Sequence, residues 1–212
     1  MRLVKFAHAC VRLEHEGRVL VVDPGHYSEP AAALEGADAV LVTHEHADHL
    51  AAEALVAAVA ARPDLRVYTH ADVAAKLSAA GDAVVPVAVG DSFEAGGFRV
   101  QAFGGTHARI HDDVPPIANL GFLVDGLVYH PGDSVVPPEG VTVDTLLVPI
   151  SGPWLRLAEA IDFTRAVAPR QAVAIHELVL SDFGLGLADN LVGNLGRTAY
   201  HRLPAGDSIE IG

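Results

Sequence analysis

The sequence predicts a layered α/β protein, in which mixed β-sheets pack together and helices cover their outer faces. Short apolar, β-branched runs alternate with Ala-rich stretches of helical propensity near both ends of the chain. Strands and glycine-rich turns, residues 83–129, separate these two alternating parts. Of the 212 residues, 50% are hydrophobic, which is enough for one well-buried domain over residues 1–212.

The first part of the chain predicts a hairpin followed by alternating strands and helices. Residues 3–13 and 18–24 predict the two strands of the hairpin, joined by a turn at Glu16. Ser28 is the predicted N-cap of a short helix that ends at Leu34. The elements expected after this helix are a strand at 39–43, a helix over 51–59, a strand at 66–69 and a helix over 71–80.

Strands dominate the middle of the chain before the alternation returns. The expected antiparallel meander consists of strands at 84–89, 98–103, 120–124 and 127–129. A strand at 144–149, a helix over 155–167 and a strand at 171–175 then restore the first pattern. Residues 178–199 are apolar and interrupted by glycines, which predicts a helix-loop segment that covers a pocket.

Composition narrows the function. A net charge of −13, without clustered Lys or Arg, argues against a nucleic-acid partner and leaves a small-molecule substrate. Residues 1–6 lack the apolar core of a signal peptide and no apolar stretch is long enough to span a bilayer, so we expect a cytoplasmic protein without a membrane partner. The single cysteine, Cys10, excludes an internal disulfide and a cysteine-rich zinc cluster, and is expected to be buried.

Three histidines and an aspartate lie within six residues, directly after the apolar run 39–43. His44 and His46 are two apart on extended backbone, so they point to one side and can share an ion. Asp48 and His49 follow where the chain begins to coil, so they can serve a second ion. Neutral imidazole and carboxylate suit zinc, and a catalytic zinc keeps one position open for water or substrate.

This H-x-H-x-D-H pattern resembles the signature of the metallo-β-lactamase fold superfamily. The resemblance implies a four-layer αββα sandwich, with the site at the edge of the sheets and further ligands at later strand ends. Three later residues occupy such positions: His107, Asp133 and His176. The ligand set that the resemblance implies is His44, His46 and His107 on one metal, Asp48, His49 and His176 on the other, and Asp133 between them.

Three further segments resemble the branch of this superfamily that contains the ascorbate-6-phosphate lactonase-like proteins and other metal-dependent hydrolases. The segments are Phe6-Ala-His8-Ala-Cys10, Asp23-Pro-Gly and Tyr129-His130-Pro-Gly-Asp133. The resemblance implies that Asp23 supports the motif loop through hydrogen bonds, with an ordinary strand-end turn as the alternative. His8 and His130 are predicted to support ligands similarly, with packing as the alternative for His130. The glycine that usually precedes His8 is Ala7 here.

The predicted function is that of a zinc-dependent hydrolase with two divalent ions, with Mn or Fe as alternatives to Zn. A metal-bound hydroxide is the expected nucleophile on an ester, lactone, amide or phosphodiester bond of a small anionic substrate. Asp48 and His111 are alternative proton carriers. Trp154, Leu180 and Phe183 are predicted to form the pocket wall, with core packing as the alternative.

Two other classes stay open at this point. An iron-dependent redox protein on the same fold is one, since iron accepts the same ligands, although diiron flavoprotein relatives carry Glu where this chain has His46. A non-enzymatic metal-binding domain is the other. Residues 178–195 are apolar enough for a subunit contact, which would make the protein a homo-oligomer.

Overall fold

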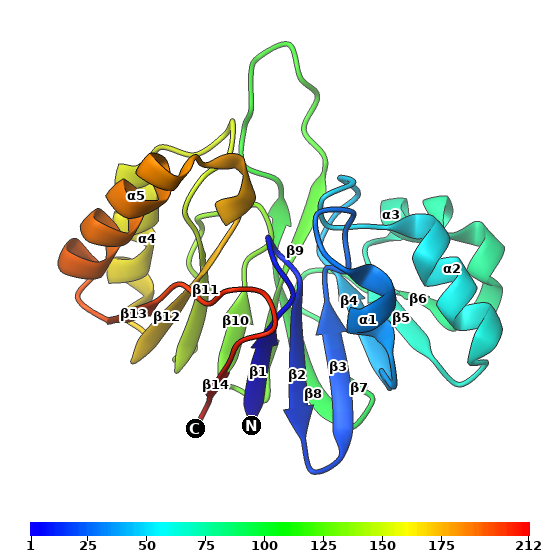
Figure 1. Ribbon diagram of the computed structural model, residues 1–212. Coiled ribbons are helices and arrows are strands. Elements are labelled where there is room, and N and C mark those ends of the chain that lie inside the picture. Colours follow the sequence, from blue (N-terminus) through cyan, green and yellow to red (C-terminus); the bar gives the residue numbers. More distant parts are fainter.

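Two seven-stranded mixed sheets face each other in the computed structural model, which describes residues 1–212 (Figure 1). The first sheet has the order β14 (Ser208–Glu210), β1 (Arg2–Lys5), β2 (Val11–His15), β3 (Arg18–Val22), β4 (Ala39–Val42), β5 (Arg66–Thr69), β6 (Val84–Pro86). The second has the order β13 (Ala199–His201), β12 (Gln171–Ile175), β11 (Thr145–Pro149), β10 (Val128–His130), β9 (Ala118–Val124), β8 (Phe98–Thr106), β7 (Ser92–Ala95).

Helices cover the outer faces of both sheets (Figure 1). Those on the first sheet are α1 (Pro30–Leu34), α2 (Ala52–Ala61), α3 (Ala71–Lys76) and the 3₁₀ helix η1 (Ser78–Ala83). Those on the second are α4 (Leu157–Val167) and α5 (Asp182–Leu195), with the 3₁₀ helix η2 (Glu177–Val179) just before α5. The predicted αββα sandwich is therefore confirmed. None of the helices combines the length and the apolar character needed to cross a membrane.

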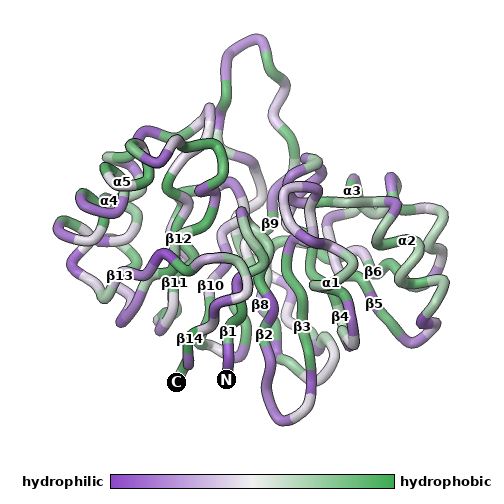
Figure 2. Tube along the Cα trace, viewed as in Figure 1, coloured by the Kyte–Doolittle hydropathy of each residue, from purple (hydrophilic) through white to green (hydrophobic).

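Three hydrophobic cores hold the four layers together, and the strands appear as mostly hydrophobic segments in Figure 2. On β4, Leu41 packs between the sheets, whereas Val40 and Val42 pack against the helices of the first sheet. On β11, Leu147 faces the inter-sheet core and Val148 the helices of the second sheet. Because successive side chains of a strand point to opposite faces, strands that are buried on both faces need the continuous apolar runs seen in the sequence.

The two sheets repeat one plan. Each begins with four antiparallel strands, β14-β1-β2-β3 in one and β7-β8-β9-β10 in the other. Each ends with parallel strands, β4 to β6 and β11 to β13. The Gly-Asp-Ser segments at 90–92 and 206–208 lead into the matching edge strands β7 and β14. Strands that carry site residues at their carboxyl ends consequently run in one direction within each sheet.

The predicted first strand, residues 3–13, is wrong. The chain turns back between β1 and β2, which pair with each other in antiparallel register. Ala7 and His8 make this turn with φ angles of 72° and 48°. Ala7 thus occupies a left-handed conformation that favours glycine. Because no glycine marks this turn, the sequence appeared to continue as one strand. Cys10 is buried as predicted, but at the end of this turn.

Two further expectations fail in detail, and three short strands were not expected. Residues 84–89 do not join the meander, because β6 pairs in parallel with β5 in the first sheet. Ser28 does not cap α1: its hydroxyl donates to the carbonyl of Gly25 at 2.8 Å, and the N-cap residue is Glu29. The short edge strands β7, β13 and β14 were not expected, since three or four residues give too little pattern for a prediction.

We expect Gly25→Ala to destabilise the protein by roughly 1–3 kcal/mol, the usual cost of overpacking. A Cβ at this position would lie 1.9 Å from the backbone oxygen of Asp48, so the loop after β3 and the motif loop would have to separate. Thermal and denaturant unfolding measure the effect. Gly186→Ala is the matched control, because open space surrounds that helical position and alanine there is expected to be neutral or stabilising. Equal unfolding midpoints for the two variants would contradict the close approach.

Candidate metal centre

Side chains from both sheets meet at the edge where β1, β3, β4, β8, β10 and β12 end. His44, His46, Asp48 and His49 lie between β4 and α2, the predicted strand-to-helix turn. The other residues that follow strand ends here are His8 after β1, Asp23 after β3, His107 after β8, Asp133 after β10 and His176 after β12. Binding sites of open α/β sheets commonly lie at the carboxyl ends of the strands.

The first group consists of His44, His46, His107 and Asp133, whose potential ligand atoms lie within 4.8 Å of one another. His44 Nε2 is 3.2 Å from His46 Nδ1. Asp133 Oδ2 is 3.2 Å from His107 Nε2 and 3.8 Å from His44 Nε2. Three imidazoles and one carboxylate oxygen therefore converge on one point.

The second group consists of His8, Asp48, His49 and His176, again within 4.8 Å. His49 Nε2 and His176 Nε2 are 2.9 Å apart, and each lies 3.7 Å from Asp48 Oδ2. His8 Nε2 is 3.0 Å from the same oxygen. His8, which was predicted only to support ligands, is thus close enough to be a further potential ligand.

Asp133 lies between the two groups. Its Oδ2 faces the first group, whereas its Oδ1 lies 2.9 Å from His49 Nε2 and 2.7 Å from His176 Nε2. The structure therefore brings all seven predicted ligand residues together, with one carboxylate between two sets of potential ligands, as the resemblance implied.

Opposite charges on His49 and its aspartate neighbours shift the pKa values of the site residues. Burial disfavours the charge on His49, but Asp133 and Asp23 outweigh it and raise the pKa of the imidazole well above its ordinary value. Burial also opposes ionisation of Asp133, yet His49 and hydrogen bonds from His107 and His176 hold the pKa of that carboxyl well below its usual range. The site thus stabilises positive charge at His49.

The donor set suits divalent cations. Imidazole nitrogens of His49 and His176 face each other at 2.9 Å, and the same holds for His44 and His46 at 3.2 Å. Burial lowers the pKa of His44 well below its ordinary value, so this ring is uncharged and has a nitrogen lone pair available for a metal. Nitrogen lone pairs that face each other inside a protein need a shared proton or a cation between them. A cation in each group would also compensate the negative charges of Asp48 and Asp133. The two groups therefore indicate a dinuclear metal site.

Asp23 orients the motif loop, as the resemblance implied. It is fully buried, and its Oδ1 accepts a hydrogen bond from the backbone N–H of Thr43 at 2.8 Å. Its Oδ2 accepts from the Thr43 hydroxyl at 2.7 Å and lies 2.6 Å from His49 Nδ1. A proton on Nδ1 of His49 leaves Nε2 as the metal-facing atom, which is the usual arrangement of a carboxylate behind a ligating histidine.

A buried ion pair fixes His8 in its turn. Lys5 Nζ lies 2.8 Å from Glu177 Oε1, and the same oxygen accepts the backbone N–H of His8 at 2.9 Å. Lys5 also donates to the carbonyl of His8. Since Glu177 directly follows His176, this network ties the first turn of the chain to the last strand end of the site. Burial lowers the pKa of Lys5, and Glu177 opposes that shift.

His130 and Asn119 support the turn that presents Asp133. His130 is buried; its Nε2 is 2.8 Å from the carbonyl of Ala9, and its Nδ1 accepts the N–H of Gly132 at 3.1 Å. Asn119 accepts the N–H of Asp133 at 3.0 Å and donates to the carbonyl of Pro131 at 2.9 Å. His130 and Asn119 therefore form hydrogen bonds with backbone groups and not with the potential ligand atoms.

A cavity of about 230 Å³ lies over the two groups. Some of the residues that line it were predicted from the sequence, and others were not. Trp154 lines it as predicted and donates its Nε1–H to Asp133 Oδ2 at 2.8 Å. Asp48 also lines it. The lining residues that were not expected are Tyr27, Ile110, Pro153 and Val179.

Leu180 and Phe183 do not line this cavity, in contrast to the prediction. His176 adopts a left-handed conformation with φ of 66°, and η2 then directs Val179 toward the site. Leu180 packs against the core beneath α4 and α5, and Phe183 is 84% exposed on α5. His111, the alternative proton carrier, lies in the loop after β8, where its Nδ1 accepts the N–H of Asp113, and is absent from the cavity lining.

We expect metal binding to the metal-free protein to release about one proton at pH 7. Because the pKa of His49 is raised, its Nε2 carries a proton that a metal must displace, whereas the pKa of His44 is lowered and that ring has none to lose. Titration calorimetry with Zn²⁺ in buffers of different ionisation enthalpy measures the release. The part of the release that comes from His49 should fade as pH rises through the raised pKa, and Asp23→Asn should shift that fading to lower pH. An enthalpy independent of buffer at pH 7 would contradict this charge state.

Trp154→Phe tests the hydrogen bond to Asp133, because phenylalanine keeps an aromatic ring in the cavity and lacks the Nε1–H donor. We expect metal affinity to fall by roughly 10–100-fold, the usual effect of losing a partner of a metal ligand. Competition with a chromophoric chelator measures it. Phe183→Leu, at an exposed position, is the control. Unchanged metal affinity in Trp154→Phe would show that the indole only packs.

Comparison with known proteins agrees with this geometry. A family model described as Beta-lactamase superfamily domain matches residues 2–176. Protein Rv0786c of Mycobacterium tuberculosis is 33% identical over 214 residues, which cover 99% of both chains. A UPF0173 protein of Pyrococcus furiosus is 34% identical over 187 residues, which cover 83% of both chains.

Two further matches concern the family and the fold. A UPF0173 metal-dependent hydrolase of Methylobacterium nodulans is 27% identical over 203 residues, covering 83% of this chain and 84% of the relative. The solved structure of Igni18, a metallo hydrolase from Ignicoccus hospitalis, shares the fold with a TM-score of 0.75 at 20% identity, covering 98% of this chain and 97% of that one. The chain belongs to the metallo-β-lactamase superfamily and, within it, to the UPF0173 family of metal-dependent hydrolases.

Proposed function

We propose that this protein is a dinuclear zinc hydrolase that cleaves an ester, lactone, amide or phosphodiester bond in a small anionic substrate. The observation that carries the proposal is Asp133, whose two oxygens each face one set of histidine ligands. Zinc is the proposed metal because the ligands are imidazoles and carboxylates, with Mn and Fe as alternatives. The narrower resemblance to ascorbate-6-phosphate lactonase-like proteins stays a prediction and supports a lactone as one candidate.

Charge at the cavity favours a small anionic substrate. Asp48 and Asp133 offset about half of the charge that two divalent ions bring, and the other ligands are histidines. Divalent ions bound here would polarise a carbonyl or phosphoryl oxygen and lower the pKa of water to about 7.

Neighbouring side chains hold the potential metal ligands in place. Trp154 holds the carboxylate of Asp133, and Asp23 holds the ring of His49, so both ligands have fixed orientations before the metals bind. Asp48 is the proposed proton carrier, since it lines the cavity and His111 does not. Burial opposes the ionisation of Asp48, but the hydrogen bond from His8 and the charges of His49 and His176 together outweigh burial and lower the pKa of Asp48 to about 2. Asp48 is therefore ionised and can accept a hydrogen bond from water in the cavity.

Asp133→Ala should lose bound metal and activity together, because it removes a ligand atom from both groups. We expect fewer than two ions per chain and a fall in kcat/KM of more than about 100-fold. Metal analysis and turnover of a p-nitrophenyl ester, a lactone and a phosphodiester, by Zn-, Mn- and Fe-loaded protein, provide the measurements. Asp182→Ala, on the exposed start of α5, is the control.

Two results would count against the proposal. A fully active Asp133→Ala variant with two ions would refute the bridging role. Wild-type protein that holds two ions and turns over none of the three substrates would favour a non-enzymatic metal-binding domain.

A further inference from the structure

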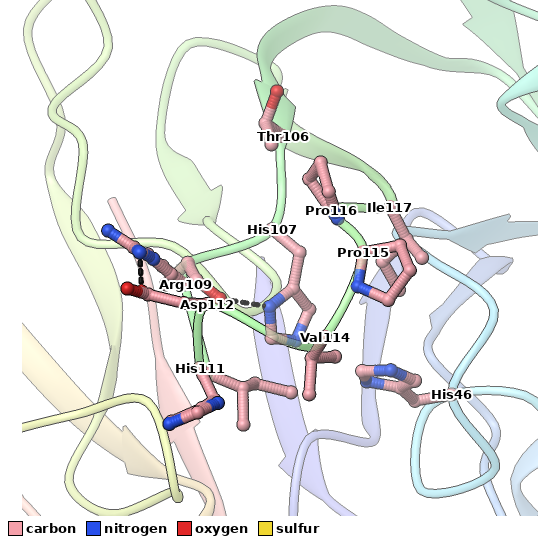
Figure 3. Close-up of a pocket in the computed structure, with 12 residues that line it drawn as sticks. His46, Thr106, His107, Arg109, His111, Asp112, Val114, Pro115, Pro116 and Ile117 are labelled. Carbon is pink, nitrogen blue, oxygen red and sulfur yellow. Dashed lines mark hydrogen bonds and ion pairs between the residues drawn. The ribbon is translucent and has the colours of Figure 1, made fainter.

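A second cavity, of about 270 Å³, opens beside the metal centre (Figure 3). The loop between β8 and β9, which rises above the rest of the molecule in Figure 1, forms most of its wall. Three residues line both this cavity and the one over the metal groups: His46, His107 and Ile110. A molecule whose reacting bond lies at the metal groups can therefore extend into the second cavity past the two histidines.

The wall of this side pocket is apolar where it approaches the histidines. Ile110 and Ile117 are half-buried, and Val114 with the two prolines that follow it supplies the rest. Arg109 forms an ion pair with Asp112, and both side chains are largely exposed. His111 accepts a hydrogen bond from the N–H of Asp113. The side chains that form the wall near the histidines carry no charge.

Backbone interactions keep the loop in one shape. The N–H of His107 donates to the carbonyl of Ile117 at 3.0 Å and closes the base of the loop. The N–H of Ala108 donates to the carbonyl of Asp133 at 2.8 Å and ties it to the metal centre. Pro115 and Pro116 fix their φ angles, which reduces the freedom of the returning arm. A preformed apolar wall loses little entropy when it binds a ligand.

We propose that the side pocket binds an uncharged alkyl or aryl substituent of the substrate, while the bond to be cleaved lies at the metal centre. The inference rests on the proposed hydrolase and narrows its substrates to esters, lactones, amides or phosphodiesters that carry such a group. A volume of about 270 Å³ is near the lower end for small-molecule pockets and suits one short chain or a single ring.

A series of alkyl hydroxamates tests this proposal on the metal-loaded protein, because the hydroxamate binds the metals and only the chain varies. We expect Kd to fall by roughly two- to fourfold per added methylene from acetohydroxamate to hexanohydroxamate, and then to level off when the pocket is full. Titration calorimetry and the fluorescence of Trp154, the single tryptophan, give Kd without any turnover.

Val114→Asp is the matched variant, since Val114 is 44% exposed and its replacement places a charge in the pocket without disturbing the core. It should abolish the gain per methylene and leave acetohydroxamate binding within about twofold of the wild type. Leu187→Asp, at a similarly exposed position on α5 outside both cavities, should keep the full gain. Circular dichroism and metal analysis establish that each variant is folded and loaded.

The outcomes separate this inference from the proposed function. Hydroxamates that bind with one Kd regardless of chain length, or a gain per methylene that survives in Val114→Asp, would overturn the pocket while leaving the metal site intact. If metal-loaded protein bound not even acetohydroxamate, the proposed metal chemistry would fail and this inference with it.

Discussion

The carboxylate of Asp133 is the interaction on which the site depends. It comes from the second sheet, yet one of its oxygens contacts His49 of the first sheet and the other contacts His107 of its own. A buried carboxylate without partners would be costly, so the convergence of these rings is what allows its burial. The same convergence leaves facing ring nitrogens that a proton satisfies only in part, and divalent cations satisfy more fully.

Hydrogen bonds behind the ligands keep this arrangement rigid. Asp23 fixes one ring of the motif, Trp154 fixes the bridging carboxylate, and Asn119 fixes the backbone that presents it. The buried pair of Lys5 and Glu177 joins the first turn of the chain to the last strand end of the site. Breaking such a buried pair leaves an uncompensated charge, so it stabilises this one arrangement of the chain against others.

The proposed side pocket assigns substrate selection to the loop between β8 and β9. His107 follows β8 as a potential ligand, and most of the ten residues after it line the wall of the pocket. One segment therefore supplies both a ligand and the surface beside it. With the proposed divalent ions bound, an apolar pocket beside them would suit an anionic substrate that also carries an uncharged substituent.

The sequence by itself determined the fold class and the potential ligands. Continuous apolar runs require strands buried on both faces, and polar residues directly after such strands must lie at one edge when the strands run parallel. The resemblance of the H-x-H-x-D-H pattern to a known signature then pointed to His107, Asp133 and His176 at later strand ends. The apolar pattern missed the reversal at Ala7, because a left-handed alanine leaves no mark on an alternating pattern, and His8 was expected only to support ligands.

Only the tertiary structure decided which side chains surround the ligands. Leu180 and Phe183 were expected in the pocket, but a left-handed His176 and the 3₁₀ turn after it bring Val179 there instead. Tyr27 and Ile110 reach the cavity from loops whose course depends on contacts across both sheets. Periodicity records which face of a regular element is buried, whereas the direction of a side chain in a loop depends on φ angles and contacts far away in the sequence.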